Sequence, residues 1–365
     1  MATNERYEYA PDYAVHPGEI LGERLAAYGM SQTELARRIG MSTKTLSQIV
    51  NGKAPVTPET AIQLERVLGV SARLWTGLDA SYRLLEARTV AAQQLVAHGE
   101  WARGFPYAEL VRRGVVESTR DISERASELL EFFGVGSVDA WHAEYGSLQV
   151  AFRRSPAFNP SPEATACWLR LAELQAMDTE CAPFDERAFM SCLRDARSIS
   201  RGLLASCDVA LRERCATAGV ALVFVPELRG THVSGAARWL NPAKAMMALS
   251  LRHKTDDHFW FSLFHEAGHL LRDSKKAVYL DSGDEGFSCV DEEQANRFAC
   301  DFLIPPDAYR RFVVRHCFSE LSVCRFSDEI GVTAGIVVGR LQHDRHLPYN
   351  SALNHLKRTV EFAEA

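Results

Sequence analysis

The chain has 365 residues, of which 47% are hydrophobic and 24% are charged. This length predicts two or three domains, and the composition excludes a disordered or collagen-like chain. Its 41 basic and 47 acidic residues give a formal net charge of −6, which excludes a basic coat over the whole chain but not a local basic patch. The longest apolar run, AGVALVFV, is far shorter than the ~20 residues of a membrane helix.

The first residues, MATNERYEYAPDY, contain no apolar segment of the kind found in export signals. None of the nine cysteines has CxxC spacing, so a cysteine zinc site is not indicated. Buried thiols in a reducing compartment are the expected state. We therefore expect a cytoplasmic protein with no membrane partner.

Residues 14–88 show the apolar spacing and capping residues of five short helices. Ser31 begins the second helix and has Glu34 three residues later, as in a capping box. Thr57, followed by Pro58, begins the fourth. The five predicted helices have the sequences GEILGERLAAYG, SQTELARRIG, STKTLSQIVNG, TPETAIQLERVLG and SARLWTGLDASYRLLEAR.

A tight turn at residues 39–42 joins the second and third helices, which is the pattern of a helix-turn-helix. The third helix would then lie in the major groove of double-stranded DNA. Residues 31–53 carry four basic residues against one acidic residue, the only local excess of positive charge near this motif. A five-helix bundle without nucleic acid is the alternative that periodicity and capping leave open. The residues expected to contact DNA are Gln32, Thr33, Ser42, Thr43, Lys44, Thr45, Ser47 and Gln48.

These segments together resemble the Xre/Cro-type helix-turn-helix, in particular its HigA-type antitoxin version. The resemblance rests on HPGEIL, SQTELARRIGMSTKTLSQIVNGK and TPETAIQLERVLGVSARLW. It implies a domain over residues 1–88 that binds an operator in double-stranded DNA. Because Xre-type modules usually read palindromes as dimers, it also implies a homodimer.

Residues 89–215 show helical spacing and little that points to chemistry. The apolar run LLEFFG is typical of a core, although it could instead line a ligand pocket that senses a signal. We interpret this part as a helical linker or sensor region. From about residue 218 the pattern changes to three short strands, GVALVFVPEL, a segment over residues 231–240, and AMMALSLR.

The helix predicted next, DDHFWFSLFHEAGHLLRDSK, contains the sequence HEAGH. His265 and His269 are four residues apart, so both imidazoles share one helix face and could bind one zinc ion. Glu266 could take a proton from a zinc-bound water and so act as general base. Two satisfied core histidines are the alternative, since a five-residue motif also arises by chance.

A zinc site of this kind needs a third protein ligand and an open fourth position. The carboxylates that begin the next helix, DEEQANRFACDFLIP, are the best candidates. Glu292 could ligate the metal while Asn296, four residues later, orients a zinc-bound histidine. Glu293 is the weaker rival, because its choice would rotate Asn296 off the shared face. Asp291 and Glu293 are otherwise ordinary first-turn acids that suit the helix dipole.

With FWFSLFHEAGHLLRDSKK, DEEQANRFACDFLIP and GVTAGIVVGRLQHDRHLP, the chain resembles the ImmA/IrrE family of metallo-endopeptidases over about residues 150–358. The resemblance implies a gluzincin-like domain over residues 216–365, with Zn²⁺ held by His265, His269 and Glu292 and with Glu266 as base. It further implies cleavage of a helix-turn-helix repressor or antitoxin and the induction of stress or mobile-element genes.

Two features of such a peptidase stay open in the sequence. The candidates for an oxyanion donor are Tyr279, Arg340, His343 and His346, each of which also suits a structural role. An extended peptide could add to a sheet edge, offered by the strand before the zinc helix or by the strand that contains residues 235–240.

The sequence thus predicts an α+β, mostly helical chain with an N-terminal five-helix helix-turn-helix domain, a helical middle region and a C-terminal peptidase domain with a small sheet. The favoured function is a DNA-binding regulator fused to a zinc endopeptidase. One alternative is a HigA-like antitoxin or repressor whose zinc fold is a sensor or scaffold. Another is a protease with a vestigial DNA module.

Overall fold

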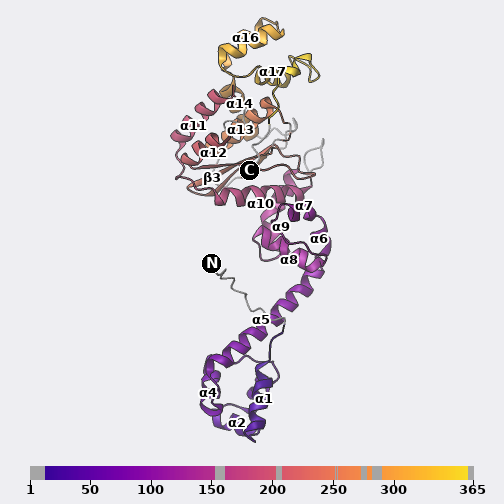
Figure 1. The fold of residues 1–365 in the computed structure, drawn as a ribbon, viewed down its shortest axis with the longest axis vertical. Helices are drawn as coiled ribbons and strands as arrows, with labels where there is room; N and C mark the ends of the chain where they lie inside the picture. The colour runs from indigo at the N-terminus through magenta and orange to yellow at the C-terminus, as the bar shows by residue number, and fades with distance from the viewer. Residues whose placement is uncertain are drawn as a thin grey trace, which may run out of the picture. The chain divides into compact units, whose positions relative to one another are not determined.

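The structure is a computed structural model that describes residues 13–152, 161–202, 208–250, 252, 254–272, 278–281 and 290–360 (Figure 1). It forms two compact units, which are treated separately below. Unit 1 comprises residues 1–100 and 119–127, and unit 2 comprises residues 101–118 and 128–365. The chain is mostly helical with one small sheet, which confirms the predicted fold class. The domain boundaries at residues 88 and 215 stay predictions.

Unit 1 contains the five helices expected in the N-terminal part. They are α1 (Pro17–Ala27), α2 (Gln32–Ile39), α3 (Thr43–Val50), α4 (Pro58–Leu68) and α5 (Ala72–Val96). The side chains of Ser31, Ser42 and Thr57 each accept a hydrogen bond from a backbone N–H in the first turn of the helix that follows them. Such caps satisfy backbone donors that have no partner inside the helix, which is why the helices begin at these residues.

The capping box expected at α2 forms only in part. Ser31 Oγ accepts from the backbone N–H of Glu34 at 3.2 Å, as predicted. The carboxylate of Glu34 binds Arg37 at 2.8 Å and Arg38 at 2.7 Å instead. In a full capping box this carboxylate would accept a hydrogen bond from the backbone N–H of Ser31. Here it forms ion pairs with two guanidinium groups instead.

The core of unit 1 is apolar and closed. Leu35, Leu46 and Leu64 are completely buried, and so is Trp75, whose indole N–H donates to the carbonyl of Val70 at 3.1 Å. Burial of this kind stabilises each side chain by roughly 1.5–3 kcal/mol relative to exposure. The core fixes α2 and α3 against each other and leaves the opposite face of α3 at the surface.

In the described part of the chain, seven further helices lie between α5 and the sheet. They are α6 (Gly99–Arg103), α7 (Tyr107–Arg112), α8 (Ile122–Phe133), α9 (Val138–Phe152), α10 (Pro162–Asp178), α11 (Glu186–Ile199) and α12 (Asp208–Thr217). In unit 2, the aromatic rings of Phe105, Phe133, Trp141 and Tyr145 pack together with centroid separations of 5.0–5.8 Å. Phe133 and its run LLEFFG thus join this buried cluster, which favours the core interpretation of that run over a sensor pocket.

The sheet of unit 2 contains β1 (Val220–Phe224), β2 (Gly235–Asn241), β3 (Lys244–Leu249) and β4 (Val278–Asp281). The strand order is β1-β3-β2-β4, with β1 parallel to β3 and the other pairs antiparallel. Helix α10 lies on one side of the sheet, and α11 to α14 lie on the other (Figure 1). Because both faces are covered, every residue of β1 is buried.

The order of the strands corrects one expectation. We expected β3 or β2 to offer an edge to a peptide, but among the described residues both are central strands. Among the described strands, β1 and β4 lie at the two edges. Strand β4, which the sequence analysis missed, pairs with β2 through four residue pairs and covers the edge that β2 would otherwise present.

Helix α13 (Asp256–Arg272) lies against the sheet, and α14 (Val290–Leu303) packs beside it. They are followed by α15 (Pro306–Val314), α16 (Glu320–Ile330), α17 (Ala334–His343) and the short 3₁₀ helix η2 (Ala352–Leu356). Phe259, Leu263, Phe264 and Ala267 of α13 are buried in the core of unit 2. Helix α13 is therefore a central helix of this unit, as its apolar sequence predicts.

The cysteines form no disulfide among the described residues, where seven are free thiols. Cys207 and Cys289 lie outside that part of the chain. Four of the seven are buried, but Cys317 is exposed, so the expectation of uniformly buried thiols is wrong there. In the described part of the chain, no helix is long and apolar enough to cross a membrane.

Candidate functional site

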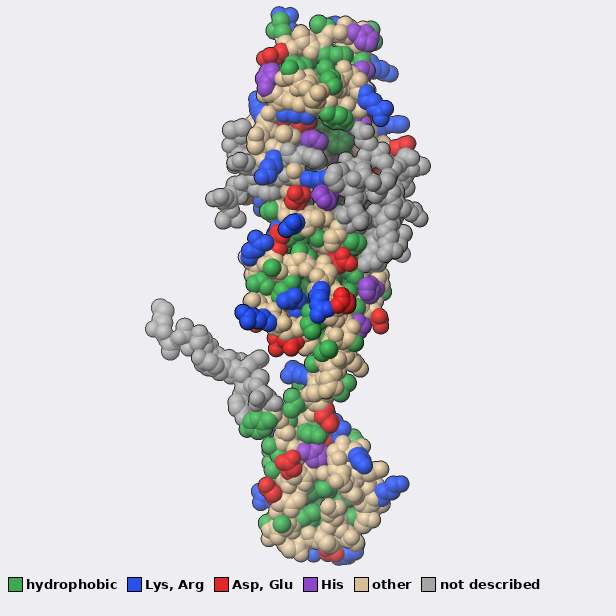
Figure 2. Space-filling view, turned by 90° about the vertical axis from the view of Figure 1, so that its right-hand side faces the viewer, with side chains coloured by type: hydrophobic (Ala, Val, Ile, Leu, Met, Phe, Trp, Pro, Cys, Tyr) green, Lys and Arg blue, Asp and Glu red, His purple; other side chains and the backbone are tan. Residues whose placement is uncertain are grey.

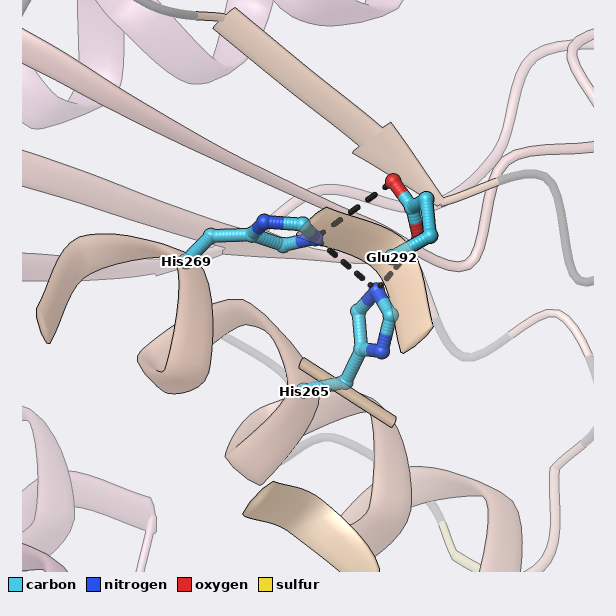
Figure 3. Close-up of side chains that lie close together, drawn as sticks. All are labelled: His265, His269 and Glu292. Carbon is cyan, nitrogen blue, oxygen red and sulfur yellow. Dashed lines mark hydrogen bonds and ion pairs between the residues drawn. The ribbon is translucent and has the colours of Figure 1, made fainter. Parts of the chain in front are cut away.

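The two histidines of HEAGH point from one face of α13 toward a carboxylate of α14 (Figure 3). The Nε2 atoms of His265 and His269 are 3.1 Å apart. Glu292 Oε2 lies 3.3 Å from His265 Nε2, and Glu292 Oε1 lies 3.5 Å from His269 Nε2. The three residues predicted as metal ligands are thus brought together around one point.

These separations match the requirements of a zinc ion. Ligands at ~2.0–2.1 Å in a tetrahedron are about 3.4 Å from one another. The two imidazole nitrogens and the carboxylate oxygens lie 3.1–3.5 Å apart, and the group is the one candidate metal cluster among the described residues. The donor set, two histidines and a glutamate, is also one that zinc prefers. The residues present therefore fit a divalent cation.

Asn296, which the sequence analysis expected to orient a histidine of the site, contacts the ring of His265. Its Oδ1 is 2.9 Å from Nδ1 of His265. With the amide oxygen facing the ring, Nδ1 carries a proton, and Nε2 is the nitrogen that faces Glu292 and would bind a metal. Glu292 and Asn296 share one face of α14, whereas the rival Glu293 is exposed.

The environment of the cluster favours ionised Glu292. Burial raises the pKa of this carboxyl, but hydrogen bonds with His265 and His269 outweigh burial and lower the pKa to about 2. Both histidines are only 2% exposed. A carboxylate that stays charged beside two buried imidazoles supplies the negative charge that a divalent cation needs.

Glu266 is completely buried next to the cluster. A glycine of β2 makes room for it, because a Cβ atom on Gly235 would come within 2.6 Å of Glu266 Oε1. At this glycine the backbone of β2 therefore lies against the carboxylate of Glu266, with no room for a side chain between them. The sequence analysis missed this role of Gly235, since strand and helix are brought together only by the fold.

A second glycine sets the distance between α13 and α14. A Cβ on Gly268 would come within 3.2 Å of Ala295 Cα and of the Phe298 ring. Small residues at a helix crossing let two backbones approach closely. Gly268 and Ala295 thereby bring Glu292 within reach of the histidines, and the small residues in HEAGH and QAN were the signal that could have indicated it.

Residues from two later segments of the chain hold the first turn of α13. Asp256 accepts hydrogen bonds from Thr333 Oγ1 at 2.7 Å and from the backbone N–H of Arg358 at 3.0 Å. Lys357 Nζ lies 2.6 Å from Asp257. Buried carboxylates are costly unless they are paired. These contacts pair Asp256 and one oxygen of Asp257, whereas Asp257 Oδ1 has no hydrogen-bond partner among the described residues. Asp256 and Asp257 therefore hold the first turn of α13 in position.

Three of the four oxyanion candidates make their described contacts outside the metal cluster. Arg340 binds Asp344 at 2.7 Å and stacks over Tyr309, and His343 binds the same Asp344 at 2.9 Å. The ring of His346 packs near that of Phe318. Tyr279 belongs to β4, but its side chain lies outside the described part of the structure. These contacts favour structural roles for Arg340 and His343.

The residues expected to contact DNA lie on α2 and α3 in unit 1. Thr43, Lys44 and Gln48 are exposed on α3, and Gln32 and Thr33 are exposed at the start of α2. Ser42 and Thr45 are also exposed, but their hydroxyls bind each other at 2.7 Å as part of the cap. Ser47 is half-buried and its Oγ lies 3.3 Å from Asn51 Nδ2.

Charge on the surface is mixed. Figure 2 shows Lys and Arg side chains interspersed with Asp and Glu over the face in view. On α2, Arg37 and Arg38 are paired with Glu34, which reduces their contribution to the local positive charge. Within the set of residues expected to contact DNA, Lys44 of α3 is the one basic residue, and its side chain is exposed.

Comparisons with known proteins agree with a helix-turn-helix in the N-terminal part of the chain. A family model described as helix-turn-helix matches residues 21–75. The uncharacterized HTH-type transcriptional regulator YddM of Escherichia coli (strain K12) is 39% identical over 80 residues, which cover 22% of this chain and 85% of that protein. The chain belongs to the helix-turn-helix family. Virulence-associated protein I of Dichelobacter nodosus is 36% identical over 72 residues, 20% of this chain and 67% of that protein.

A second family model, described as IrrE N-terminal-like domain, matches residues 225–342. This helix-turn-helix protein therefore also carries a domain of a metallopeptidase-type family, and the matched range contains the whole metal cluster. The two matches confirm the resemblances drawn from the sequence. The chain therefore consists of a helix-turn-helix DNA-binding domain fused to an IrrE-like domain, an arrangement that is consistent with a regulator.

Solved structures similar to the chain match over its N-terminal part. Pseudomonas aeruginosa antitoxin HigA with higBA promoter is 34% identical, with coverage of 22% of this chain and 90% of that one and a TM-score of 0.22. An addiction module antidote protein of a HigA family from Coxiella burnetii is 30% identical, with coverage of 23% and 91% and a TM-score of 0.21.

Proposed function

We propose that the chain is a transcriptional regulator whose helix-turn-helix domain binds an operator and whose IrrE-like domain is a zinc endopeptidase. The observation that carries the proposal is the convergence of three donor atoms at zinc-ligand separations, next to the buried carboxylate of Glu266. The resemblance to the ImmA/IrrE family supports a regulatory protein, a helix-turn-helix repressor or an antitoxin, as the substrate.

Each residue has a distinct role in the proposed hydrolysis. His265, His269 and Glu292 would hold Zn²⁺ and leave a fourth position open. A zinc ion bound there supplies Lewis-acid polarisation and a lowered water pKa. Glu266 takes the proton of the attacking water and passes it to the leaving amine nitrogen. Asn296 orients His265, and Gly235 leaves space for Glu266.

The test is cleavage by the zinc-loaded full chain. Purified helix-turn-helix repressors encoded beside its gene are the candidate substrates, and mass spectrometry locates any cut. We expect one defined cut that disappears with chelator and returns with zinc. Glu266→Gln should lower the cleavage rate by about 10²–10⁴-fold, the usual contribution of a general base, while bound zinc and DNA binding stay unchanged.

The outcome separates the proposal from its main alternative. If the wild-type chain binds zinc and represses its promoter but cuts none of these proteins, the domain is a sensor or scaffold of an antitoxin-like repressor. If cleavage persists in Glu266→Gln, the general base has been assigned to the wrong residue.

We further propose that α3 reads the operator in the major groove. Lys44 and Gln48 are exposed on one face of α3, opposite its buried Leu46 and Ile49. A glutamine can bind adenine through two hydrogen bonds, and a lysine can bind guanine or phosphate. The chain is expected to bind as a homodimer with two α3 helices about 34 Å apart along the DNA.

Fluorescence anisotropy with fragments of the chain's own promoter tests the reading helix. Lys44→Ala and Gln48→Ala should each weaken specific binding by about 5–150-fold, the effect of losing one base contact. Arg66→Ala is a matched control, since Arg66 is exposed on α4. Equal affinities for all four proteins would rule out α3 as the reader, and sedimentation of the complex gives the oligomeric state.

A further inference from the structure

Unit 2 contains a small, partly open pocket, with a cavity volume of about 20 Å³, at the N-terminal half of α13. Its walls come from α13, from the end of β3 and from the residues that link them, together with the residue before β2. Its lining residues are Ser234, Leu249, Arg252, Lys254, Thr255, His258, Phe259 and Ser262. No residue of the metal cluster lines this pocket, so it is a feature separate from the ligands.

The pocket continues the candidate active site along α13. Ser262 lies one turn before Glu266, and His258 lies one further turn back, so these residues follow one another on the helix surface. On the other wall, Ser234 directly precedes Gly235, whose Cα faces the carboxylate of Glu266. An extended peptide advances about 3.3 Å per residue, so the pocket lies within about three residues of a bond cut beside Glu266.

The charged groups of the lining are cationic. Arg252 is half-buried and donates to the carbonyl of His232 at 2.7 Å, and Lys254 is exposed. The carboxylates nearest in sequence have other partners. Asp256 is held by Thr333, and Asp257 lies 2.6 Å from Lys357, closer than its 4.0 Å separation from His258.

The lining also offers hydroxyl groups. Thr255 Oγ1 is buried and has no hydrogen-bond partner among the described residues. Ser262 and Ser234 place two further hydroxyls in the wall. A buried hydroxyl without a partner costs free energy, which a bound acceptor group would recover. Two cations with hydroxyl donors are suited to a carboxylate.

We propose that this small, partly open pocket receives the carboxylate end of an acidic side chain of the peptide substrate, within about three residues of the scissile bond. The proposal rests on the proposed peptidase function and specifies its substrate class. Arg252 and Lys254 are the residues that set the preference, and Thr255 contributes a hydrogen bond to the carboxylate.

A binding experiment tests the pocket without cleavage. The zinc-loaded Glu266→Gln chain is titrated with fluorescein-labelled peptides that are identical apart from a central Glu, Gln or Lys. We expect the Glu peptide to bind at least about tenfold more tightly than the Gln peptide at low salt. Lys254→Glu should reverse the order, so that the Lys peptide binds best, a result that loss of folding cannot produce.

Arg311→Glu is the matched control, because Arg311 is exposed on α15 and does not line the pocket. It should keep the wild-type preference. Equal binding of the Glu and Gln peptides, or an unchanged preference in Lys254→Glu, would overturn the proposal.

Cleavage of a peptide library by the wild-type chain separates the two proposals. Cuts with acidic residues enriched within three positions, and with basic residues enriched for Lys254→Glu, support both. Cuts without any such enrichment would support the peptidase proposal and contradict the proposal that the pocket binds an acidic side chain. If the chain prefers acidic peptides in the binding experiment but cuts no peptide in any library, the peptidase proposal is contradicted and the pocket proposal is supported.

Discussion

Asn296 decides which nitrogen of His265 faces the metal cluster. Because its Oδ1 lies 2.9 Å from Nδ1, the proton is held on that side of the ring. Asn296→Ala should therefore weaken zinc binding by about 10–100-fold, as loss of such a contact usually does. Competition with a chromophoric chelator measures the affinity. Gln294→Ala, an exposed position on the same helix, is the control, and equal affinity of the two variants would contradict the assignment.

Gly235 is the residue whose replacement tests the position of the general base. A methyl group there would come within 2.6 Å of Glu266 Oε1 and 2.9 Å of its Cγ, so the carboxylate must move. A displacement of about 1 Å can cost about 10²-fold in rate, and we expect a loss of that order in Gly235→Ala with zinc content unchanged. Gly136→Ala, which meets nothing within 4 Å, should cleave normally. Full activity of Gly235→Ala would show that the base tolerates the shift.

The carboxyl group of Glu34 in unit 1 has a lowered pKa. Hydrogen bonds from Arg37 and Arg38 lower the pKa of its carboxyl from an ordinary 4.5 to about 2. Because the folded-state pKa is depressed, the stabilisation is present above pH 4.5 and is lost as the pH falls through about 2. Carbon NMR of labelled glutamate should record this low pKa. Arg37→Gln with Arg38→Gln should return the pKa toward 4.5, and an unchanged value would exclude these ion pairs as the cause.

At the scale of elements, two glycines of α17, Gly335 and Gly339, lie against the first turn of α13. A Cβ on Gly335 would come within 2.9 Å of the Lys357 backbone, which is part of the segment that holds Asp256 and Asp257. Gly335→Ala should lower the free energy of unfolding by about 1–3 kcal/mol, the usual cost of overpacking. Gly22→Ala in α1 meets nothing within 4 Å and should instead stabilise by up to about 1 kcal/mol. Chemical denaturation measures both, and a stabilised Gly335→Ala would show that α17 has room to move.

The sequence could predict those elements whose signals are local. Helices α1 to α5 have their capping residues and apolar spacing within a few positions, and HEAGH places two imidazoles on one face by helix geometry alone. Glu292 could be named because Asn296 follows it by one helical turn. Strand β4 was missed because four residues carry too short an alternation, and its pairing with β2 is a tertiary contact. Gly235 was missed for the same reason.

At the scale of the whole molecule, the two proposed activities belong to different compact units. The expected DNA-contacting residues lie in unit 1, whereas α13 and α14 supply every proposed ligand within unit 2. Chelation should therefore lower the melting temperature of one unfolding transition and leave the other in place. At zinc 100-fold above its dissociation constant, the stabilisation is about 2.7 kcal/mol. Scanning calorimetry with and without chelator checks this, and a shift of both transitions would mean that the units unfold together.

The spacing of the ligands along the chain has a consequence for folding during synthesis. Glu292 follows His265 by only 27 positions, so an ion that joins them closes a short loop at a small cost in chain entropy. Every donor has been synthesised before α15, α16 and α17 exist. A nascent chain could thus hold a complete chelating set early, and a metal ion captured at that stage would pair α13 with α14 before Lys357 and Arg358, which contact the first turn of α13, have been made.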